Sequence, residues 1–271
     1  MSKESRLLAR NVRQHCLRMV YRGESGHIGS MLSAADIVAV LYSGVLNVDA
    51  ADPEKPDRDR LIYSKGHGGA ALFATLAEKG FFPKEWLDTY YKDAGKLSGH
   101  ISHHVAGVEF STGSLGHGLP VACGMCLAAK QSKKSHRIFC VVSDGDLNEG
   151  SSWEAIMLAG QHHYDNLTMV VDYNRLQALG RSEDIIDLEN LGEKLRNFGW
   201  QVLEIDGHDH DALEKAFSRL PLEDGRPSAV ICRTVKGKGV SFAENDYRWH
   251  YGGITPELYE QGRADIEKME I

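Results

Sequence analysis

The sequence lacks a long apolar run, an export signal and an excess of basic residues. Its longest uncharged apolar stretch, residues 37–48, is too short and too polar to span a bilayer. The first residues carry charges of both signs and lead into a helical pattern without the apolar core of a signal peptide, so we expect a cytoplasmic protein outside the membrane. With 31 lysines and arginines against 38 acidic residues, the formal net charge of −7 excludes a nucleic-acid binder that works by neutralising phosphates.

Cysteine is scarce, whereas glycine is abundant. The five cysteines are odd in number and scattered, which is typical of reduced thiols in the cytoplasm. Cys123 and Cys126 have the spacing of a redox pair, but they lie inside an apolar helical pattern after Gly118, which favours a packing role. Glycine makes up 28 of 271 residues, above the usual share of about 7%. This excess indicates that the backbone comes close to another group.

Short apolar strands alternate with helices along most of the chain. Helical spacing of apolar residues predicts one helix that ends near Gly23 and another from about Ser33 to Leu46, with Ser33 as its cap. After a charged loop that contains two prolines, the predicted strands cover residues 60–64, 137–142, 167–173, 200–205 and 229–234. This alternation predicts an α/β fold with a doubly wound, mainly parallel sheet covered by helices on both faces, in a single domain over residues 1–271.

Two polar side chains follow neighbouring predicted strands. Asp144 lies after the strand that ends at residue 142, and Ser151 with Glu154 predicts a capping box at the start of the next helix. Asn174 follows the next strand, so a right-handed crossover brings it to the same sheet edge, where such sheets bind ligands. Their oxygens suit Mg²⁺ or Ca²⁺, and Gly145 lets a phosphate approach the backbone. The pattern indicates a metal-bridged diphosphate; an ordinary capped turn beside an unrelated asparagine is the alternative.

The same residues belong to a longer set of matching motifs. Asp144-Gly-Asp-Leu-Asn-Glu-Gly-Ser-Ser-Trp-Glu-Ala155, together with Asp172-Tyr-Asn-Arg-Leu176, resembles the thiamine-diphosphate motif of transketolases. Further segments match transketolases in the same order: Ser25-Gly-His-Ile-Gly-Ser30, Ser64-Lys-Gly-His67, Leu97-Ser-Gly-His100, Thr112-Gly-Ser-Leu-Gly116, Lys236-Gly-Lys-Gly239 and Trp249-His250. The resemblance covers about residues 6–253, nearly the whole chain.

The resemblance implies an activity, its cofactors and a partner. Transketolases use thiamine diphosphate with Mg²⁺, or with Ca²⁺ or Mn²⁺ in its place, to transfer a two-carbon ketol unit from a ketose (phosphate) donor to an aldose acceptor. The chain matches only the domain that binds the diphosphate; the glutamate that activates the cofactor belongs to the family's second domain. We therefore expect the N-terminal subunit of a split transketolase of carbohydrate metabolism, active with a C-terminal subunit that carries the pyrimidine-binding domain, as a heterotetramer.

The resemblance also assigns roles to individual residues. The metal ligands would be Asp144, Asn174 and the backbone carbonyl of Leu176. Cofactor contacts would come from Ser30, His67, Gly113, Ser114, Leu115, Gly145, Asn174, Lys236 and His250. The catalytic residues would be His27, His67, His100 and His250, whose imidazoles can donate or accept hydrogen bonds near neutral pH, and Glu149, which would meet its counterparts across the subunit interface and share a proton there.

Several positions depart from the family pattern and bear on substrate preference. Ser143 replaces the first glycine of the motif, Asp146 adds a negative charge near the site, and His117 lies near the pyrimidine loop where many relatives have glutamine. Tyr251 follows His250 where many transketolases have glycine. After the fourth strand, the turn Asp206-Gly-His-Asp209 resembles a family turn that caps the next helix.

Other interpretations stay open at this level. Without the resemblance, a histidine beside a glycine is most simply a surface or turn residue. His103 and His104 near His100 look like a metal cluster, but one loop does not supply the converging ligands that zinc needs. The alternative functions are another thiamine-diphosphate enzyme component, such as a 1-deoxyxylulose-phosphate-like synthase or a decarboxylase, and a non-catalytic cofactor-binding subunit.

Overall fold

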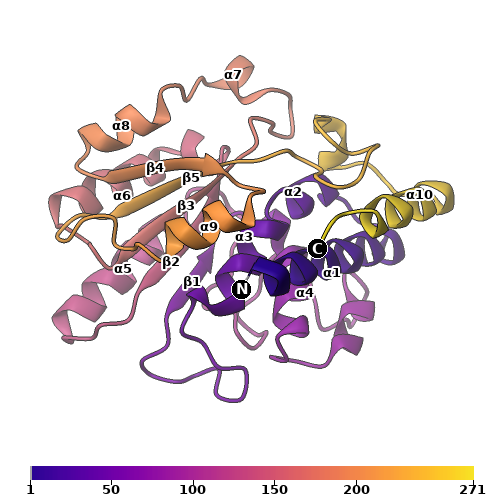
Figure 1. Ribbon diagram of the computed structural model, residues 1–271, viewed down its shortest axis with the longest axis horizontal. Helices are drawn as coiled ribbons and strands as arrows, with labels where there is room; N and C mark the ends of the chain where they lie inside the picture. Colours follow the sequence, from indigo (N-terminus) through magenta and orange to yellow (C-terminus); the bar gives the residue numbers. More distant parts are fainter. Residues whose placement is uncertain (1) are drawn as a thin grey trace.

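A five-stranded, all-parallel sheet forms the centre of the computed structural model, which describes residues 2–271 (Figure 1). The strand order is β1-β2-β3-β5-β4. The strands are β1 (Arg60–Tyr63), β2 (Ile138–Ser143), β3 (Leu167–Tyr173), β4 (Gln201–Asp206) and β5 (Ser228–Arg233). Every residue of β2 and β3 is buried, as expected where helices cover both faces of a parallel sheet. The predicted α/β fold is confirmed.

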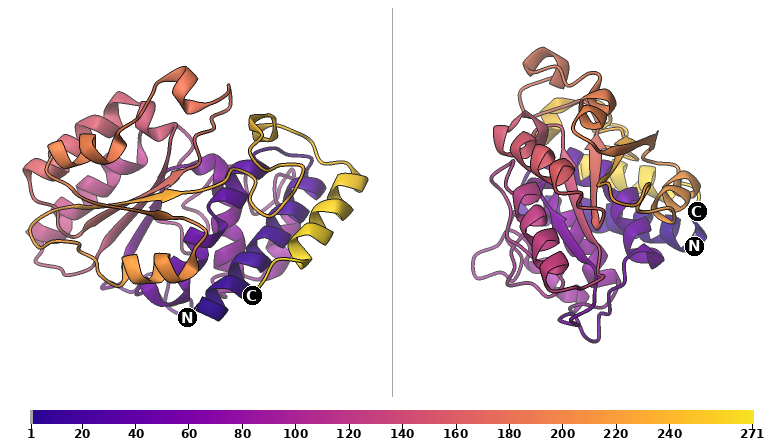
Figure 2. Two further views of the ribbon diagram at one scale, coloured as in Figure 1. Left: turned by 45° about the horizontal axis from the view of Figure 1, so that its top comes forward. Right: turned by 90° about the vertical axis from the view of Figure 1, so that its left-hand side faces the viewer.

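Helices cover the two faces of this sheet in separate groups, as Figure 2 shows. Because side chains alternate along a strand, Phe139 and Val141 pack into one apolar cluster while Cys140 and Val142 pack into another. The first cluster includes residues of α1 (Ser2–Gly23), α2 (Ile28–Ser33), α3 (Ala35–Val40), α4 (Gly69–Glu78), α9 (His210–Phe217) and α10 (Pro256–Glu267). The second includes residues of α5 (Gly118–Gln131), α6 (Gly150–Gln161) and α8 (Leu191–Asn197).

Short helical turns connect these elements, and two of them directly follow the carboxyl ends of β1 and β2. Their bounds are η1 (Leu41–Val45, a π-helical turn), η2 (Gly66–Gly68), η3 (Lys84–Thr89), η4 (Asp146–Asn148), α7 (Ser182–Ile185) and η5 (Tyr247–His250). In Figure 1, η5 belongs to the yellow segment that returns from β5 toward α2 before the chain ends in α10. This return brings residues near position 250 beside residues near position 30.

Two local predictions were wrong because tertiary hydrogen bonds take up the side chains concerned. The predicted helix from Ser33 to Leu46 is divided into α3 and η1, and Ser33 ends α2; its hydroxyl donates to the Asp172 carboxylate at 2.6 Å. The predicted capping box is absent, since α6 begins at Gly150 and the Ser151 hydroxyl donates to the Gly116 carbonyl oxygen at 2.7 Å. In contrast, Asp209 caps α9 as expected, accepting bonds from two backbone N–H groups.

The cysteines lie in the core and not at a redox site. Cys123 and Cys126 are buried in α5 and form no disulfide, as the packing interpretation predicts. Burial raises the pKa of Cys123 to about 12, the opposite of what a reactive thiol needs. Across residues 2–271, no helix is both long and apolar enough to cross a membrane.

Candidate functional site

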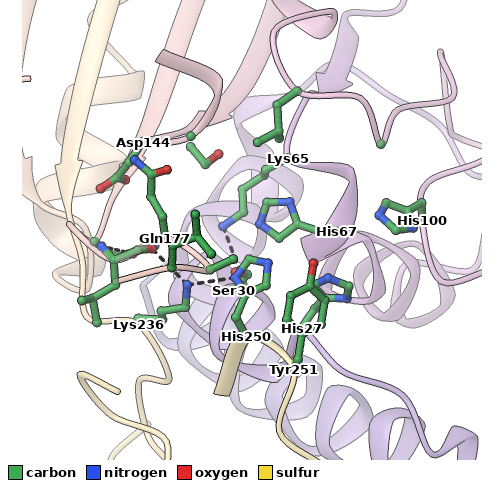
Figure 3. Close-up of a pocket in the computed structure, with 18 residues that line it drawn as sticks. His27, Ser30, Lys65, His67, His100, Asp144, Gln177, Lys236, His250 and Tyr251 are labelled. Atoms are coloured by element: carbon green, nitrogen blue, oxygen red, sulfur yellow. Dashed lines mark hydrogen bonds between the residues drawn. The ribbon is translucent and has the colours of Figure 1, made fainter. Parts of the chain in front are cut away.

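A cavity of about 280 Å³ lies at the carboxyl ends of the central strands (Figure 3). Apart from Ser114 and Glu149, every residue assigned to the site by sequence lines it. Figure 3 shows Asp144 and Gln177 at one end and the imidazoles of His27 and His67 toward the other, with Lys236 below. Parallel strands of this kind bind ligands at this edge. The fold therefore brings together motifs that are far apart in the sequence.

Ser114 and Glu149 are the two predicted residues outside the cavity lining. Both are exposed, but Ser114 lies between Gly113 and Leu115, which do line the cavity. Glu149 occupies the N-cap position of α6 through its backbone alone. An exposed position is compatible with contact to a second chain, so the interface role of Glu149 stays a prediction.

Oxygen atoms suited to a hard cation gather at the end of β2 and β3. The register pairs Ser143 with Asp172, so the following Asp144 and the nearby Asn174 leave adjacent strands. Asp144 is only 1% exposed; its Oδ2 accepts a bond from Ser182 at 2.9 Å, while its Oδ1 has no hydrogen-bond partner among the described residues. Burial raises the pKa of Asp144 to about 6. A buried carboxylate oxygen without a partner calls for a cation.

The two other predicted metal ligands adjoin this carboxylate in the cavity wall. The Asn174 Oδ1 accepts a bond from the Leu176 N–H at 3.1 Å, and the Leu176 carbonyl oxygen accepts one from Lys236 Nζ at 3.0 Å. A carboxylate, an amide oxygen and a backbone carbonyl are donors that Mg²⁺ and Ca²⁺ prefer. No group of three His, Cys, Asp or Glu within residues 2–271 is arranged for a metal. The donor set therefore fits a hard cation that takes further ligands from outside the chain.

The backbone around Gly145 leaves room for a phosphate. A Cβ atom at position 145 would lie 2.9 Å from Leu115 Cδ1, so a side chain there would displace the Leu115 side chain. Glycine thus permits close approach of a ligand to the backbone at the end of β2. These features fit a diphosphate bridged to a metal.

Two of the residues that depart from the family pattern, Ser143 and Asp146, are joined by hydrogen bonds. The Asp146 carboxylate is fully buried and does not line the cavity. It accepts bonds from the Ser64 hydroxyl (2.6 Å), the Gly116 N–H (3.0 Å), and the N–H and hydroxyl of Ser143 (both 2.9 Å). Asp146 therefore lies close to the site, next to Ser143 in the cavity wall, without lining the cavity itself. Its carboxylate instead ties the loop that ends at Gly116 to the ends of β1 and β2.

Four histidines that are widely separated in sequence meet at the other end of the cavity. Ring centroids of His27 lie 5.6 Å from His67, 5.7 Å from His100 and 4.9 Å from His250. His27 has a left-handed φ of 71°, and its N–H donates to the His250 carbonyl oxygen at 2.7 Å. This unusual conformation for a non-glycine residue fixes the imidazole at the base of α2.

Burial and nearby cations keep three of these imidazoles, those of His27, His67 and His250, neutral. Burial lowers the pKa of His27 to about 4, with His100 and Lys236 adding to the effect. Burial and Lys236 lower the pKa of His250 to about 3, and burial with Lys65 holds that of His67 well below its usual range. A neutral imidazole offers one donor and one acceptor, which suits hydroxyl and carbonyl oxygens.

A buried lysine and aspartate beside the cavity escaped the sequence analysis. Lys65 and Asp172 are both 0% exposed and form an ion pair. Lys65 Nζ also donates to the Ser30 carbonyl oxygen at 2.9 Å. Both residues lie within matched motifs, but the motifs alone do not show that the two side chains meet. The pair joins the end of β1 to the end of β3, and Lys65 itself lines the cavity.

A second chamber of about 470 Å³ opens from the same histidines. His27, His100 and Tyr251 line both spaces, and the Tyr251 ring lies 5.0 Å from that of His27. Tyr251 is 69% exposed at the mouth, so this departure from the family pattern adds an aromatic wall there. The described lining of the chamber includes hydroxyl, aromatic and imidazole groups but no Lys, Arg, Asp or Glu.

Comparisons with known proteins agree with the motifs and geometry. A sequence model of the family described as "Transketolase, thiamine diphosphate binding domain" matches residues 4–261. One subunit of the apulose-4-phosphate transketolase of Phocaeicola vulgatus is 38% identical over 262 residues, which cover 95% of this chain and 93% of the relative. A 6-deoxy-6-sulfo-D-fructose transketolase subunit of Clostridium sp. is 41% identical over 244 residues, covering 90% of this chain and 89% of the relative.

Solved structures share the fold over almost the whole chain. Transketolase from Campylobacter jejuni superposes with a TM-score of 0.92 at 31% sequence identity. The match covers 98% of this chain but 43% of that structure. The chain therefore spans less than half the length of this solved relative, whereas it spans about nine tenths of the relatives named as subunits.

Proposed function

This chain belongs to the transketolase family and contains its thiamine-diphosphate-binding domain; from this we propose that it is the cofactor-binding subunit of a two-chain transketolase. It would form one domain over residues 1–271 and act with a second subunit that carries the pyrimidine-binding domain and the activating glutamate. The near-equal length of the relatives named as subunits supports this assignment. The observation that carries the enzymatic part is the unpartnered Asp144 Oδ1 buried at the sheet edge beside Asn174.

Cofactor and metal binding would rest on the residues at this edge. Asp144, Asn174 and the Leu176 carbonyl oxygen would hold Mg²⁺, and the Gly145 N–H would bind the diphosphate. The remaining cofactor contacts would come from Ser30, His67, Gly113, Ser114, Leu115, Lys236 and His250, as predicted from sequence. When bound, thiamine diphosphate supplies the nucleophile and the electron sink for breaking a carbon–carbon bond.

Neutral imidazoles would bind and orient the sugar. His27, His67 and His250 can each donate one hydrogen bond and accept another without placing a full charge in the cavity, and the His100 ring lies beside them. This suits a substrate with adjacent hydroxyl and carbonyl oxygens, and it lets an imidazole hold or release a proton at those atoms. The histidine cluster favours ketol transfer between sugars over a decarboxylase reaction.

The substrates would be a ketose donor and an aldose acceptor. The two relatives described above are named for apulose-4-phosphate and for 6-deoxy-6-sulfo-D-fructose, and both names denote a sugar with an anionic group. We extend this substrate class, a sugar with a phosphate or similar anion, to the present chain. Glu149 on the exposed start of α6 would face the second copy of the complex in a heterotetramer. The buried, unpaired thiols support a cytoplasmic location.

Reconstitution tests this proposal. The chain is purified from its native lysate, and a co-purifying subunit is identified by mass spectrometry and produced separately. We expect ketol transfer from a ketose phosphate only when both chains, thiamine diphosphate and Mg²⁺ are present. Full activity of this chain alone would contradict the two-chain assignment. Cofactor binding without turnover in the complex would favour the non-catalytic subunit, and release of CO₂ from a 2-oxo acid would favour the synthase or decarboxylase alternative.

A further inference from the structure

A buried polar cluster lies behind the cavity, on the far side of the loop that carries Lys236. Its centre is Asp36 in α3, which is 4% exposed. Arg13 of α1 donates to both carboxylate oxygens of Asp36, at 2.8 and 2.5 Å. His208 and His210, at the turn before α9, reach the same carboxylate at 2.7 and 3.0 Å. Burial alone would raise the pKa of Asp36, but the Arg13 guanidinium and the two imidazoles hold this pKa well below its usual range.

Two members of this cluster also hold the backbone of residues 235–238. The Val235 N–H donates to His208 Nε2 at 2.8 Å, and Arg13 Nε donates to the Lys238 carbonyl oxygen at 3.0 Å. Between these anchors, Lys236 extends into the cavity, where its Nζ lies 3.0 Å from the Leu176 carbonyl oxygen and 3.2 Å from His250 Nδ1. The position of the Lys236 ammonium thus depends on a backbone that is fixed from the opposite side.

The hydrogen bonds of His208 determine where its proton lies. Because Nε2 accepts the Val235 N–H, the ring proton must be on Nδ1, from which it is donated to Asp36. The imidazole therefore acts as a rigid bridge between the carboxylate and the loop. His210 also contacts Asp36, but its second nitrogen lies 2.8 Å from the Ser5 hydroxyl, and among residues 2–271 it makes no hydrogen bond to this loop.

We infer that His208, oriented by its hydrogen bond to Asp36, is a positioning residue for the cofactor site, because it fixes the backbone at Val235 and so places Lys236 in the cavity. The functional consequence rests on the proposed function, in which Lys236 contacts the cofactor. The claim that the Val235 backbone is fixed in this way is independent of the proposed function. Neither residue lines the cavity that contains Asp144 and Asn174, and His208 contacts the site through the loop.

Hydrogen–deuterium exchange on the full chain, without cofactor, tests the structural part. In His208→Asn the side-chain amide occupies the place of Nδ1 beside Asp36. No atom remains at the place of Nε2 to accept the Val235 N–H. His210→Asn is the matched control, since it also removes an imidazole from Asp36. We expect the Val235 amide to exchange roughly tenfold faster or more in His208→Asn, as for the loss of one buried hydrogen bond, and at the wild-type rate in His210→Asn. His208→Gln, which returns an acceptor toward Val235, should restore most of the protection.

The inference is overturned if both asparagine variants, or neither, accelerate exchange at Val235, or if His208→Gln behaves like His208→Asn.

The second readout is the dissociation constant of thiamine diphosphate with Mg²⁺, measured by calorimetry on the complex with the second subunit. We expect it to rise about tenfold in His208→Asn and less than twofold in His210→Asn. Equal constants for the two variants would overturn the link to the cofactor site. If the wild-type complex itself binds no thiamine diphosphate, the proposed function fails while the exchange result still decides the structural inference.

Discussion

Replacing Asp144 with asparagine should stabilise the chain in the absence of metal while abolishing metal-dependent cofactor binding. The carboxylate is buried, and one of its oxygens has no hydrogen-bond partner within residues 2–271. An asparagine has the same shape and can still accept the Ser182 bond through its oxygen. It removes the negative charge that burial disfavours and that a cation requires, and it places an NH₂ group where the unpartnered Oδ1 was. Stability and binding should therefore change in opposite directions.

The size of the effect follows from the pKa of Asp144. Burial raises this pKa from 3.8 to about 6, and one pKa unit corresponds to about 1.4 kcal/mol, so the ionised carboxylate costs about 3 kcal/mol. Because the folded-state pKa lies above the unfolded one, the cost is absent below about pH 4. It grows as the pH rises from about 4 to 6 and is fully present above that. Each kcal/mol corresponds to roughly 2–4 °C in melting temperature for a chain of this size.

The assay is urea unfolding of wild type and Asp144→Asn in a metal chelator at pH 8 and pH 4. We expect the variant to be more stable by about 3 kcal/mol at pH 8, with a difference near zero at pH 4. Adding Mg²⁺ and thiamine diphosphate should stabilise the wild type, by about 2.7 kcal/mol at a hundredfold excess over the dissociation constant, and leave the variant unchanged. A variant that is less stable than wild type at pH 8 in chelator would refute the reasoning.

Two further predictions concern the floor and the mouth of the cavity. Lys65→Met should lower the free energy of unfolding by about 3–5 kcal/mol, because it leaves the buried Asp172 carboxylate without its cation. Urea unfolding measures this loss, and adding Asp172→Asn should recover part of it; no loss in the single variant would contradict the buried ion pair. His100→Ala should reduce kcat of the complex by about 10²–10⁴-fold with a much smaller change in cofactor affinity. Kinetics and calorimetry measure the two effects. A large loss of cofactor affinity with little change in kcat would assign His100 to cofactor binding instead.

Local patterns predicted most elements and the place of the site. Apolar runs gave the five strands to within one or two residues, because a parallel sheet covered on both faces needs such runs. The prediction that Asp144 and Asn174 leave adjacent strands was correct because a short right-handed crossover allows few other arrangements. Capping was less predictable: Ser33 and Ser151 had suitable local sequences, yet their hydroxyls bond to Asp172 and Gly116.

The sequence by itself determined the alternation of strands and helices, the edge at which ligands bind and the family to which the motifs belong, since each of these depends on residues close together in the chain. Only the tertiary structure decided which partner each buried charge meets. Lys65 and Asp172 are 107 positions apart, and Asp36 and His208 are 172 apart. The physical reason is that a buried charge is tolerated only beside a partner, and which partner is near depends on how distant elements pack.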